Sequence, residues 1–110
     1  MTDFAQYYLT CADTKEADII VERLLDARLI ACAKQVPVSA SYWWEQKKET
    51  ANEVLLVMES RIDLYEDIES LVAENHSYKT FVLECVPLAR VNKSAADWLN
   101  SNLRVTKNEK

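Results

Sequence analysis

One histidine, one cysteine and one glutamate give this sequence its best set of metal-binding side chains. His76 is the only histidine of the chain, and imidazole is both a common metal ligand and a switch near neutral pH. Copper favours imidazole and thiolate ligands, so His76 with Cys11 and Glu84 forms the predicted metal site. The alternative is structural: a histidine at a helix end often neutralises the helix dipole or binds a carbonyl group, and Cys11 is then a buried thiol.

Aromatic residues make up a second candidate site. Tyr42, Trp44 and Tyr78 could line a cleft between subunits, where their rings would receive a small ligand and His76 would supply polarity. The alternative is that Tyr42, Trp43 and Trp44 pack in an oligomer interface. The sequence leaves both interpretations of these rings open.

Catalytic chemistry finds little support in the sequence. Nucleophilic catalysis would need Cys11 or a serine beside His76 and a third residue to orient the histidine, and no local motif provides them. Glu66 and Glu69 are spaced like neighbours on a helix, where a solvated charged face is the ordinary explanation. We therefore expect a protein that is not an enzyme.

The absence of glycine excludes several ligand-binding motifs. An average chain of this length carries roughly eight glycines, and P-loops and GxGxxG turns need them because other residues adopt such backbone conformations only at a cost. Left-handed turns must then fall to other residues, and Asn52, Asn75 and Asn92 are the expected positions. The net charge of -5 argues against a nucleic-acid partner, because phosphate binding relies on clustered Lys and Arg.

Cysteine usage and hydropathy indicate a reducing compartment. Cys11, Cys32 and Cys85 are odd in number and widely spaced, which favours reduced core thiols over a disulfide framework. The longest apolar run covers residues 54–58 and is too short to cross a bilayer, and no basic segment followed by an apolar one opens the chain. We expect a cytoplasmic protein with no membrane partner.

The elements that position these side chains should belong to one domain, because 110 residues suffice for a single hydrophobic core. Apolar residues make up 49% of the chain and charged residues 28%, which is typical of a packed globule. Residues 1–103 form the predicted domain, and residues 104–110 a polar C-terminal tail that is frayed.

The first half of the chain reads as strand, helix and a long extended segment. Residues 4–11 are rich in aromatic and β-branched types and predict a strand. Residues 14–28 predict a helix, with an N-cap followed three residues later by an acid. Residues 29–44 are extended, with Pro37 at a bulge or a sheet edge, and residues 45–50 form a polar turn.

The second half adds a buried strand, a helix, a further strand and a short terminal helix. Residues 53–59 predict a central strand covered on both faces, and the next helix runs from Ser60 to Asn75. Residues 80–87 form the fourth strand, and Ser94 caps the terminal helix. This order is the α+β, ferredoxin-like βαββαβ sandwich, with the first and third strands central and the helices on one face.

The second and third strands should form a hairpin longer than the domain that carries it. Arms of roughly fifteen residues at ~3.3 Å each span about 50 Å, whereas a domain of this size is about 30 to 35 Å across. The overhanging part would carry Tyr42, Trp43 and Trp44, and a neighbouring subunit is their natural cover. The alternative is that the hairpin bends over its own sheet and buries these rings internally.

The sequence also resembles the CutA family of divalent-cation tolerance proteins over essentially the whole domain. The matching segments are Thr10, Ala17, the Arg28-Leu29-Ile30-Ala31-Cys32 run with Pro37, the Tyr42-Trp43-Trp44-Glu45 run, His76-Ser77-Tyr78, and Trp98-Leu99. They resemble the family's "LAAC…P", "YxWE", "HPY" and "WL" elements in the same order. The chain departs from the family pattern at Ser77, where proline is usual, and at Phe81 and Val82, where a Pro-Glu pair is usual.

The resemblance implies more than the residues indicate alone. It implies a ferredoxin-like homotrimer in which long hairpins link the subunit sheets, and an association with metal-ion response and copper binding. The family trimer also resembles that of the PII signalling proteins. We therefore expect a homotrimeric divalent-cation tolerance protein that binds copper or another divalent ion. The alternative is a PII-like signalling or adaptor module that binds a small ligand or a protein partner in the intersubunit cleft.

Overall fold

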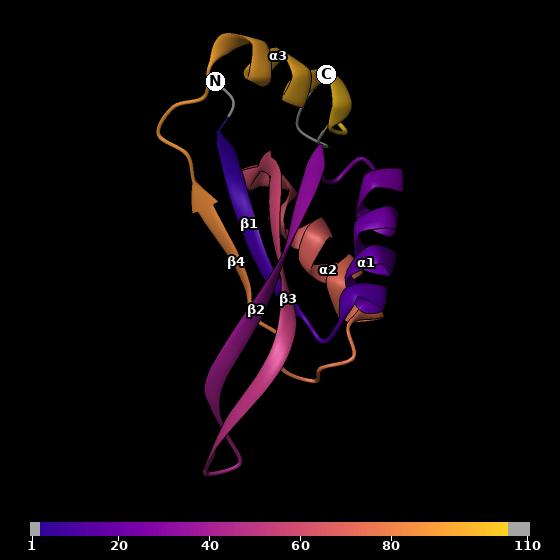
Figure 1. Ribbon diagram of the computed structural model, residues 1–110. Helices are drawn as coiled ribbons and strands as arrows, with labels where there is room; N and C mark the ends of the chain where they lie inside the picture. The colour runs from indigo at the N-terminus through magenta and orange to yellow at the C-terminus, as the bar shows by residue number, and fades with distance from the viewer. Residues whose placement is uncertain (1–2, 106–110) are drawn as a thin grey trace.

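The computed structural model describes residues 3–105, which form a four-stranded antiparallel sheet with two helices on one face (Figure 1). The strands are β1 (Phe4–Cys11), β2 (Cys32–Trp44), β3 (Lys47–Arg61) and β4 (Leu83–Pro87). The helices are α1 (Thr14–Asp26), α2 (Tyr65–Asn75) and α3 (Lys93–Asn102), and the 3-10 turn η1 (Ile62–Leu64) precedes α2. The sheet order β2-β3-β1-β4 places β1 and β3 in the centre. The predicted ferredoxin-like α+β fold is thereby confirmed.

The core lies between the sheet and the pair of helices α1 and α2. Side chains alternate along β1, so every second residue faces the helices and has no exposed surface. One stripe of each helix packs against them at the i, i+3, i+4 spacing of an amphipathic helix. The buried residues of β1, α1 and α2 are Ala5, Tyr7, Leu9, Cys11, Ala17, Ile20, Leu24, Ile68 and Val72.

Helix α1 ends in a hydrogen-bonded cap. The N–H of Arg28 bonds to Leu25 O at 3.0 Å, and the N–H of Leu29 bonds to Leu24 O at 3.0 Å. This pattern is a Schellman motif, which requires a left-handed residue directly after the C-cap Ala27. Arg28 takes that conformation, with φ of 60°, so the helix stops at Asp26 rather than at residue 28.

The residues with a left-handed backbone conformation are not the three asparagines that were expected. The positive-φ residues of the described chain are Arg28, Glu45 and Gln46, whereas Asn75 ends α2 and Asn92 has a φ of -64°. The prediction was wrong because position in a cap or tight turn, set by the neighbouring hydrogen bonds, outweighs residue preference.

Strands β2 and β3 form the predicted long hairpin. Their register runs without interruption from Cys32 opposite Glu59 to Trp44 opposite Lys47, whereas β1 pairs with β3 only from Val54 onward. The outer part of the hairpin therefore projects beyond the sheet (Figure 1), and the molecule extends 48 × 26 × 23 Å. The hairpin does not bend over its own sheet, so the alternative interpretation is wrong.

The hairpin turn is tighter than the polar turn predicted at residues 45–50. Only Glu45 and Gln46 lie between the strands, and their φ angles of 50° and 69° match a two-residue type I′ turn. Residues 47–50 belong to β3, because each pairs with a residue of β2. Pro37 belongs to β2, an outer strand of the sheet, and pairs with Val54 of β3. Its predicted edge position is therefore confirmed.

Helices α1 and α2 leave the other face of the sheet uncovered, and this face is called the open face below (Figure 1). The register places Tyr8, Leu55 and Val57 on it, with Val36 and Val86 on the outer strands. These side chains are half-buried or exposed. The prediction that residues 53–59 are covered on both faces is therefore wrong for a single chain.

The predicted starts of the second and third helices shift by a few residues. Ser60 does not cap α2, because its Oγ donates to Leu29 O at 2.6 Å and the chain passes through η1 first. Ser94 lies inside α3, whose N-cap is Asn92. The fourth strand begins at Leu83, not at residue 80.

The end of the described chain is held to the domain. The N–H of Arg104 bonds to Arg28 O at 2.9 Å, and the guanidinium group of Arg61 bonds to Arg104 O at 2.5 Å. Arg104 is thus not part of a frayed tail, and residues 106–110 of the predicted tail lie outside the described residues. Among residues 3–105, no helix is long and apolar enough to cross a membrane.

Candidate functional site

The imidazole of His76 is buried, and both of its ring nitrogens have partners. Nε2 lies 2.8 Å from the carbonyl oxygen of Thr10, and Nδ1 accepts from the backbone N–H of Tyr78 at 3.0 Å. A carbonyl oxygen can only accept, so the geometry assigns neutral His76 the tautomer with its proton on Nε2. The rings of Tyr78 and Phe81 flank the imidazole at centroid distances of 4.9 Å and 5.3 Å. His76 thus contacts a carbonyl group, as the alternative interpretation expected.

The carboxylate of Glu16 ties the start of α1 to the segment that follows α2. It accepts from the N–H of Ala12 at 2.9 Å, and from the N–H and the hydroxyl of Ser77 at 2.6 Å and 3.0 Å. One of its oxygens lies 3.5 Å from Nδ1 of His76. Burial alone would raise the pKa of Glu16, but these hydrogen bonds favour the charged form and the pKa is lowered overall.

The predicted metal ligands do not converge. Cys11 faces the helices, because alternate β1 residues from Ala5 to Cys11 are buried there. Glu84 pairs with Tyr8 and lies on the open face, the opposite side of the sheet. Within residues 3–105, no group of three His, Cys, Asp or Glu side chains is arranged to hold a metal ion. The set of His76, Cys11 and Glu84 is therefore not assembled in one chain.

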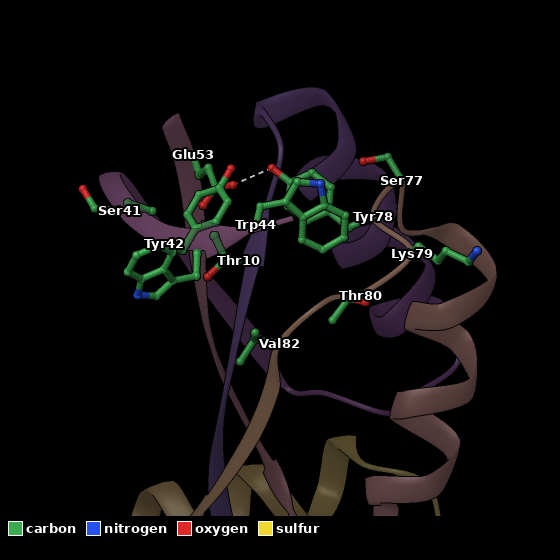
Figure 2. Close-up of a pocket in the computed structure, with 12 residues that line it drawn as sticks. Thr10, Ser41, Tyr42, Trp44, Glu53, Ser77, Tyr78, Lys79, Thr80 and Val82 are labelled. Atoms are coloured by element: carbon green, nitrogen blue, oxygen red, sulfur yellow. Dashed lines mark hydrogen bonds between the residues drawn. The ribbon is translucent and has the colours of Figure 1, made fainter. Parts of the chain in front are cut away.

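The three predicted cleft residues all line one pocket. Tyr42 and Trp44 come from the outer part of β2, and Tyr78 comes from the loop that follows α2 (Figure 2). The pocket has a volume of about 580 Å³, which lies within the usual range for small-molecule sites. It is lined by Thr10, Ala40, Ser41, Tyr42, Trp43, Trp44, Glu53, Ser77, Tyr78, Lys79, Thr80 and Val82.

Glu53 is the functional candidate that the sequence did not reveal. Its side chain lies in this pocket, only 7% of the residue is exposed, and its Oε2 accepts from the hydroxyl of Tyr78 at 2.5 Å (Figure 2). Burial and the hydrogen bond to this carboxylate raise the pKa of Tyr78, so its phenol stays protonated. A charged residue directly before the apolar run of residues 54–58 was the one signal available, and it does not specify the partner.

A second polar group lies on the open face. Gln6 Nε2 donates to Glu59 at 2.9 Å, Tyr8 donates to Gln6 at 2.9 Å, and Lys34 lies 3.8 Å from the same carboxylate. Cys32 sits opposite Glu59 in the β2-β3 register, and burial raises the pKa of its thiol. These side chains share one face of adjacent strands.

The fold and the pocket define a ferredoxin-like α+β domain with a projecting hairpin and an aromatic binding pocket beside it. Residues 5–102 match the family of the CutA1 divalent ion tolerance protein. The chain belongs to this family, as the sequence resemblance predicted.

Relatives from two organisms support the assignment. The chain is 31% identical over 96 residues to the divalent-cation tolerance protein CutA of Archaeoglobus fulgidus, covering 87% of this chain and 94% of that one. It is 36% identical over 92 residues to the protein of the same name from Pyrococcus horikoshii, covering 84% and 90%.

Solved structures agree with the sequence matches. The Archaeoglobus fulgidus protein, described as a periplasmic divalent cation tolerance protein, superposes with a TM-score of 0.90 at 30% identity, over 92% of this chain and 99% of that one. CutA1 from Oryza sativa superposes with a TM-score of 0.92 at 25% identity, over 96% and 97%.

Proposed function

We propose that this chain is a homotrimeric divalent-cation tolerance protein that binds copper or another divalent metal ion. The observation that carries the proposal is the match of residues 5–102 to the CutA1 divalent ion tolerance family. The relatives bear names that refer to divalent-cation tolerance. We further propose that the protein works without catalysis and in the cytoplasm, where its three cysteines, all free, would stay reduced.

Assembly into oligomers is supported by two surfaces that one chain leaves uncovered, and the number three is what the family resemblance implies. Trp43, Trp44 and Tyr42 on the projecting hairpin are 70%, 47% and 41% exposed, and the open face presents Leu55, Val57 and Val36. Burying large apolar side chains contributes roughly 2 kcal/mol each. Light scattering on the eluted protein should give three times the 12.7 kDa mass of one chain, and the mass of a single chain would contradict this part of the proposal.

Metal binding is supported by the family match and by donors that are not fully buried. Cys32 and Glu59 are half-buried on the open face, whereas Cys11 is fully buried and His76 has both ring nitrogens hydrogen-bonded. Copper titration of the purified oligomer should therefore show saturable binding that survives His76→Gln and weakens about tenfold in Cys32→Ser. Cys85→Ser, on the helix side of β4, is the matched control.

The metal titration has clear contrary outcomes. Loss of copper binding in His76→Gln, with folding intact by circular dichroism, would place the site at the histidine as the sequence first suggested. The absence of saturable binding in every form of the protein would contradict a copper-binding function altogether.

A second candidate function rests on a separate observation. Tyr42, Trp44 and Tyr78 line one pocket of about 580 Å³, as expected for a PII-like sensing or adaptor module that binds a small ligand. A metabolite screen by thermal shift tests this candidate, and a compound that binds should raise the melting temperature. A blank screen together with a blank pull-down would count against it.

A further inference from the structure

Glu53 is a nearly buried carboxylate that lacks a positive partner within the described residues. Only 7% of the residue is exposed, and no Lys, Arg or His of residues 3–105 lies within 4.0 Å of it. Among residues 3–105, one hydrogen bond reaches its carboxylate, from the hydroxyl of Tyr78, although a carboxylate has room for about four. A buried charge is costly unless it is paired, so this site favours the arrival of a cation.

The aromatic walls of the pocket favour a particular kind of cation. The register places Tyr42 and Trp44 on the same face of β2, and Tyr78 reaches Glu53 from the loop after α2. Aromatic rings attract ammonium groups through their negative faces, and Trp is the strongest of them. Rings together with one carboxylate match an organic ammonium group, whose alkyl part also buries apolar surface.

A bare divalent ion and an anion both fit this pocket less well. Calcium requires six to eight oxygen ligands, and magnesium keeps several waters in addition to carboxylates. Glu53 is the one carboxylate among the lining residues, and the carbonyl of Thr10 already accepts from His76. An anion would meet Glu53 directly, and the amine of Lys79 points away from Glu53 (Figure 2).

We propose that this pocket binds an alkylammonium group, with Glu53 as its counter-ion and Tyr42, Trp44 and Tyr78 as its aromatic walls. The proposal rests on the second candidate function, that of a ligand-binding module, and names the ligand class. The ammonium group comes either from a free amine or quaternary ammonium compound, or from a lysine side chain of a neighbouring subunit. The chemistry of recognition is the same in both cases.

The test compares a cation with a neutral molecule of the same shape. Choline and 3,3-dimethylbutan-1-ol are titrated into the purified oligomer, with tryptophan fluorescence as the readout. Choline should bind about tenfold more tightly, because only the charged group gains from the carboxylate and the rings. Glu53→Gln, which keeps an acceptor for Tyr78, should reduce this preference to the smaller part that the rings alone supply. Glu69→Gln, the same change at an exposed site on α2, should preserve it.

The two sources of the ammonium group give different results. Choline binding in wild type identifies a free ligand. If choline does not bind, but Glu53→Gln raises the dissociation constant of the subunits about tenfold and Glu69→Gln does not, the group is a neighbouring lysine. Equal binding of choline and its neutral analogue, or no binding with unchanged subunit association, would overturn the proposal.

A further variant keeps the test independent of folding and of the metal. Trp44→Leu removes one wall at a half-exposed position while Glu53 stays in place, and it should weaken choline binding about fivefold. If Glu53→Gln does not fold, unchanged choline binding in Trp44→Leu overturns the proposal by itself. All titrations are run with a chelator, so a failed copper titration leaves their outcome unaffected.

Discussion

At the scale of single residues, Glu16 organises the candidate site without lining the aromatic pocket. Its carboxylate holds Ala12 and Ser77, and Ser77 stands between His76 and Tyr78 in the chain. His76 in turn bonds Thr10 and Tyr78. The position from which Tyr78 reaches Glu53 therefore depends on the hydrogen bonds of Glu16 and His76, two residues that do not line the pocket.

Glu16→Gln tests this dependence. An amide can keep one accepting oxygen but turns an N–H donor toward the donors of Ser77, so we expect a loss of about 1–3 kcal/mol in the free energy of unfolding. Glu22→Gln, at an exposed site on the same helix, should change it by less than about 0.5 kcal/mol. Urea unfolding at pH 7 measures both, and equal effects would contradict the role assigned to Glu16.

The same residue predicts a pH dependence. The pKa of Glu16 is lower in the folded protein than its ordinary value of 4.5, so the unfolded chain binds the proton more readily. This contribution to stability is complete above pH 4.5 and is lost as the pH falls through the folded pKa. The stability difference between wild type and Glu16→Gln should therefore shrink on acidification below that pH. A difference that stays constant down to pH 3 would be inconsistent with a lowered pKa.

At the scale of elements, the hairpin shows how strand length and turn chemistry act together. Thirteen residues of β2 pair with β3 in one register, and the turn closes with Glu45 and Gln46 in left-handed conformations. Lys48 lies 6.0 Å from the ring of Trp43 across the hairpin, which gives the tip a cation–π contact. Cross-strand pairs of this kind define the register despite an unfavourable turn sequence.

Replacing the turn by Asn-Gly should stabilise the tip. Left-handed backbone costs about 1–2 kcal/mol for an ordinary residue and little for glycine, and Asn-Gly is the preferred type I′ sequence. We expect Glu45→Asn combined with Gln46→Gly to slow hydrogen exchange of the amides in residues 42–49 by about fivefold, a gain of about 1 kcal/mol. Gln46→Ala keeps the Cβ atom and should bring no protection. Faster exchange in the Asn-Gly variant would contradict this assignment of the turn.

At the scale of the whole molecule, one side of the sheet packs into the core, and the other side, the open face, is left uncovered by the helices. Tyr7, Leu9 and Met58 on the helix side have no exposed surface, whereas Leu55 and Val57 on the open face remain half-buried. The hairpin adds the rings of Tyr42 and Trp44 to the same uncovered side, because the parity of β2 places these two residues there, whereas Trp43 lies on the opposite face. The proposed oligomer would cover both surfaces.

Val57→Lys should separate assembly from folding. In a lone chain this half-buried site tolerates a long side chain whose charge reaches water, but an interface that covers it would bury an unpaired charge. We expect the subunit dissociation constant to rise by about a hundredfold, corresponding to roughly 3 kcal/mol. Ile19→Lys, on the outer side of α1 and 39% exposed, is the matched control. A Val57→Lys protein that keeps the wild-type mass on dilution would contradict an interface on the open face.

Much of the fold could be predicted from local patterns. The strand at residues 4–11, the start of the first helix at residue 14 and the excess length of the hairpin follow from alternation, capping and counting residues. The hairpin turn, the start of α2 and the left-handed residues were misplaced. In each case a hydrogen bond to a distant or flanking group, such as that of Ser60 to Leu29, decided the local conformation.

The amino-acid sequence by itself determined the order of the elements, the α+β class, the family, and the gathering of Tyr42, Trp44 and Tyr78 as a candidate cleft. Only the tertiary structure decided that Glu53 meets Tyr78, that His76 is engaged at both nitrogens, and that Cys11 and Glu84 lie on opposite faces. The physical reason is that periodicity along a chain fixes which face a residue takes within its own element. Strand register and loop path, which join residues 25 or 66 positions apart, determine which side chains meet.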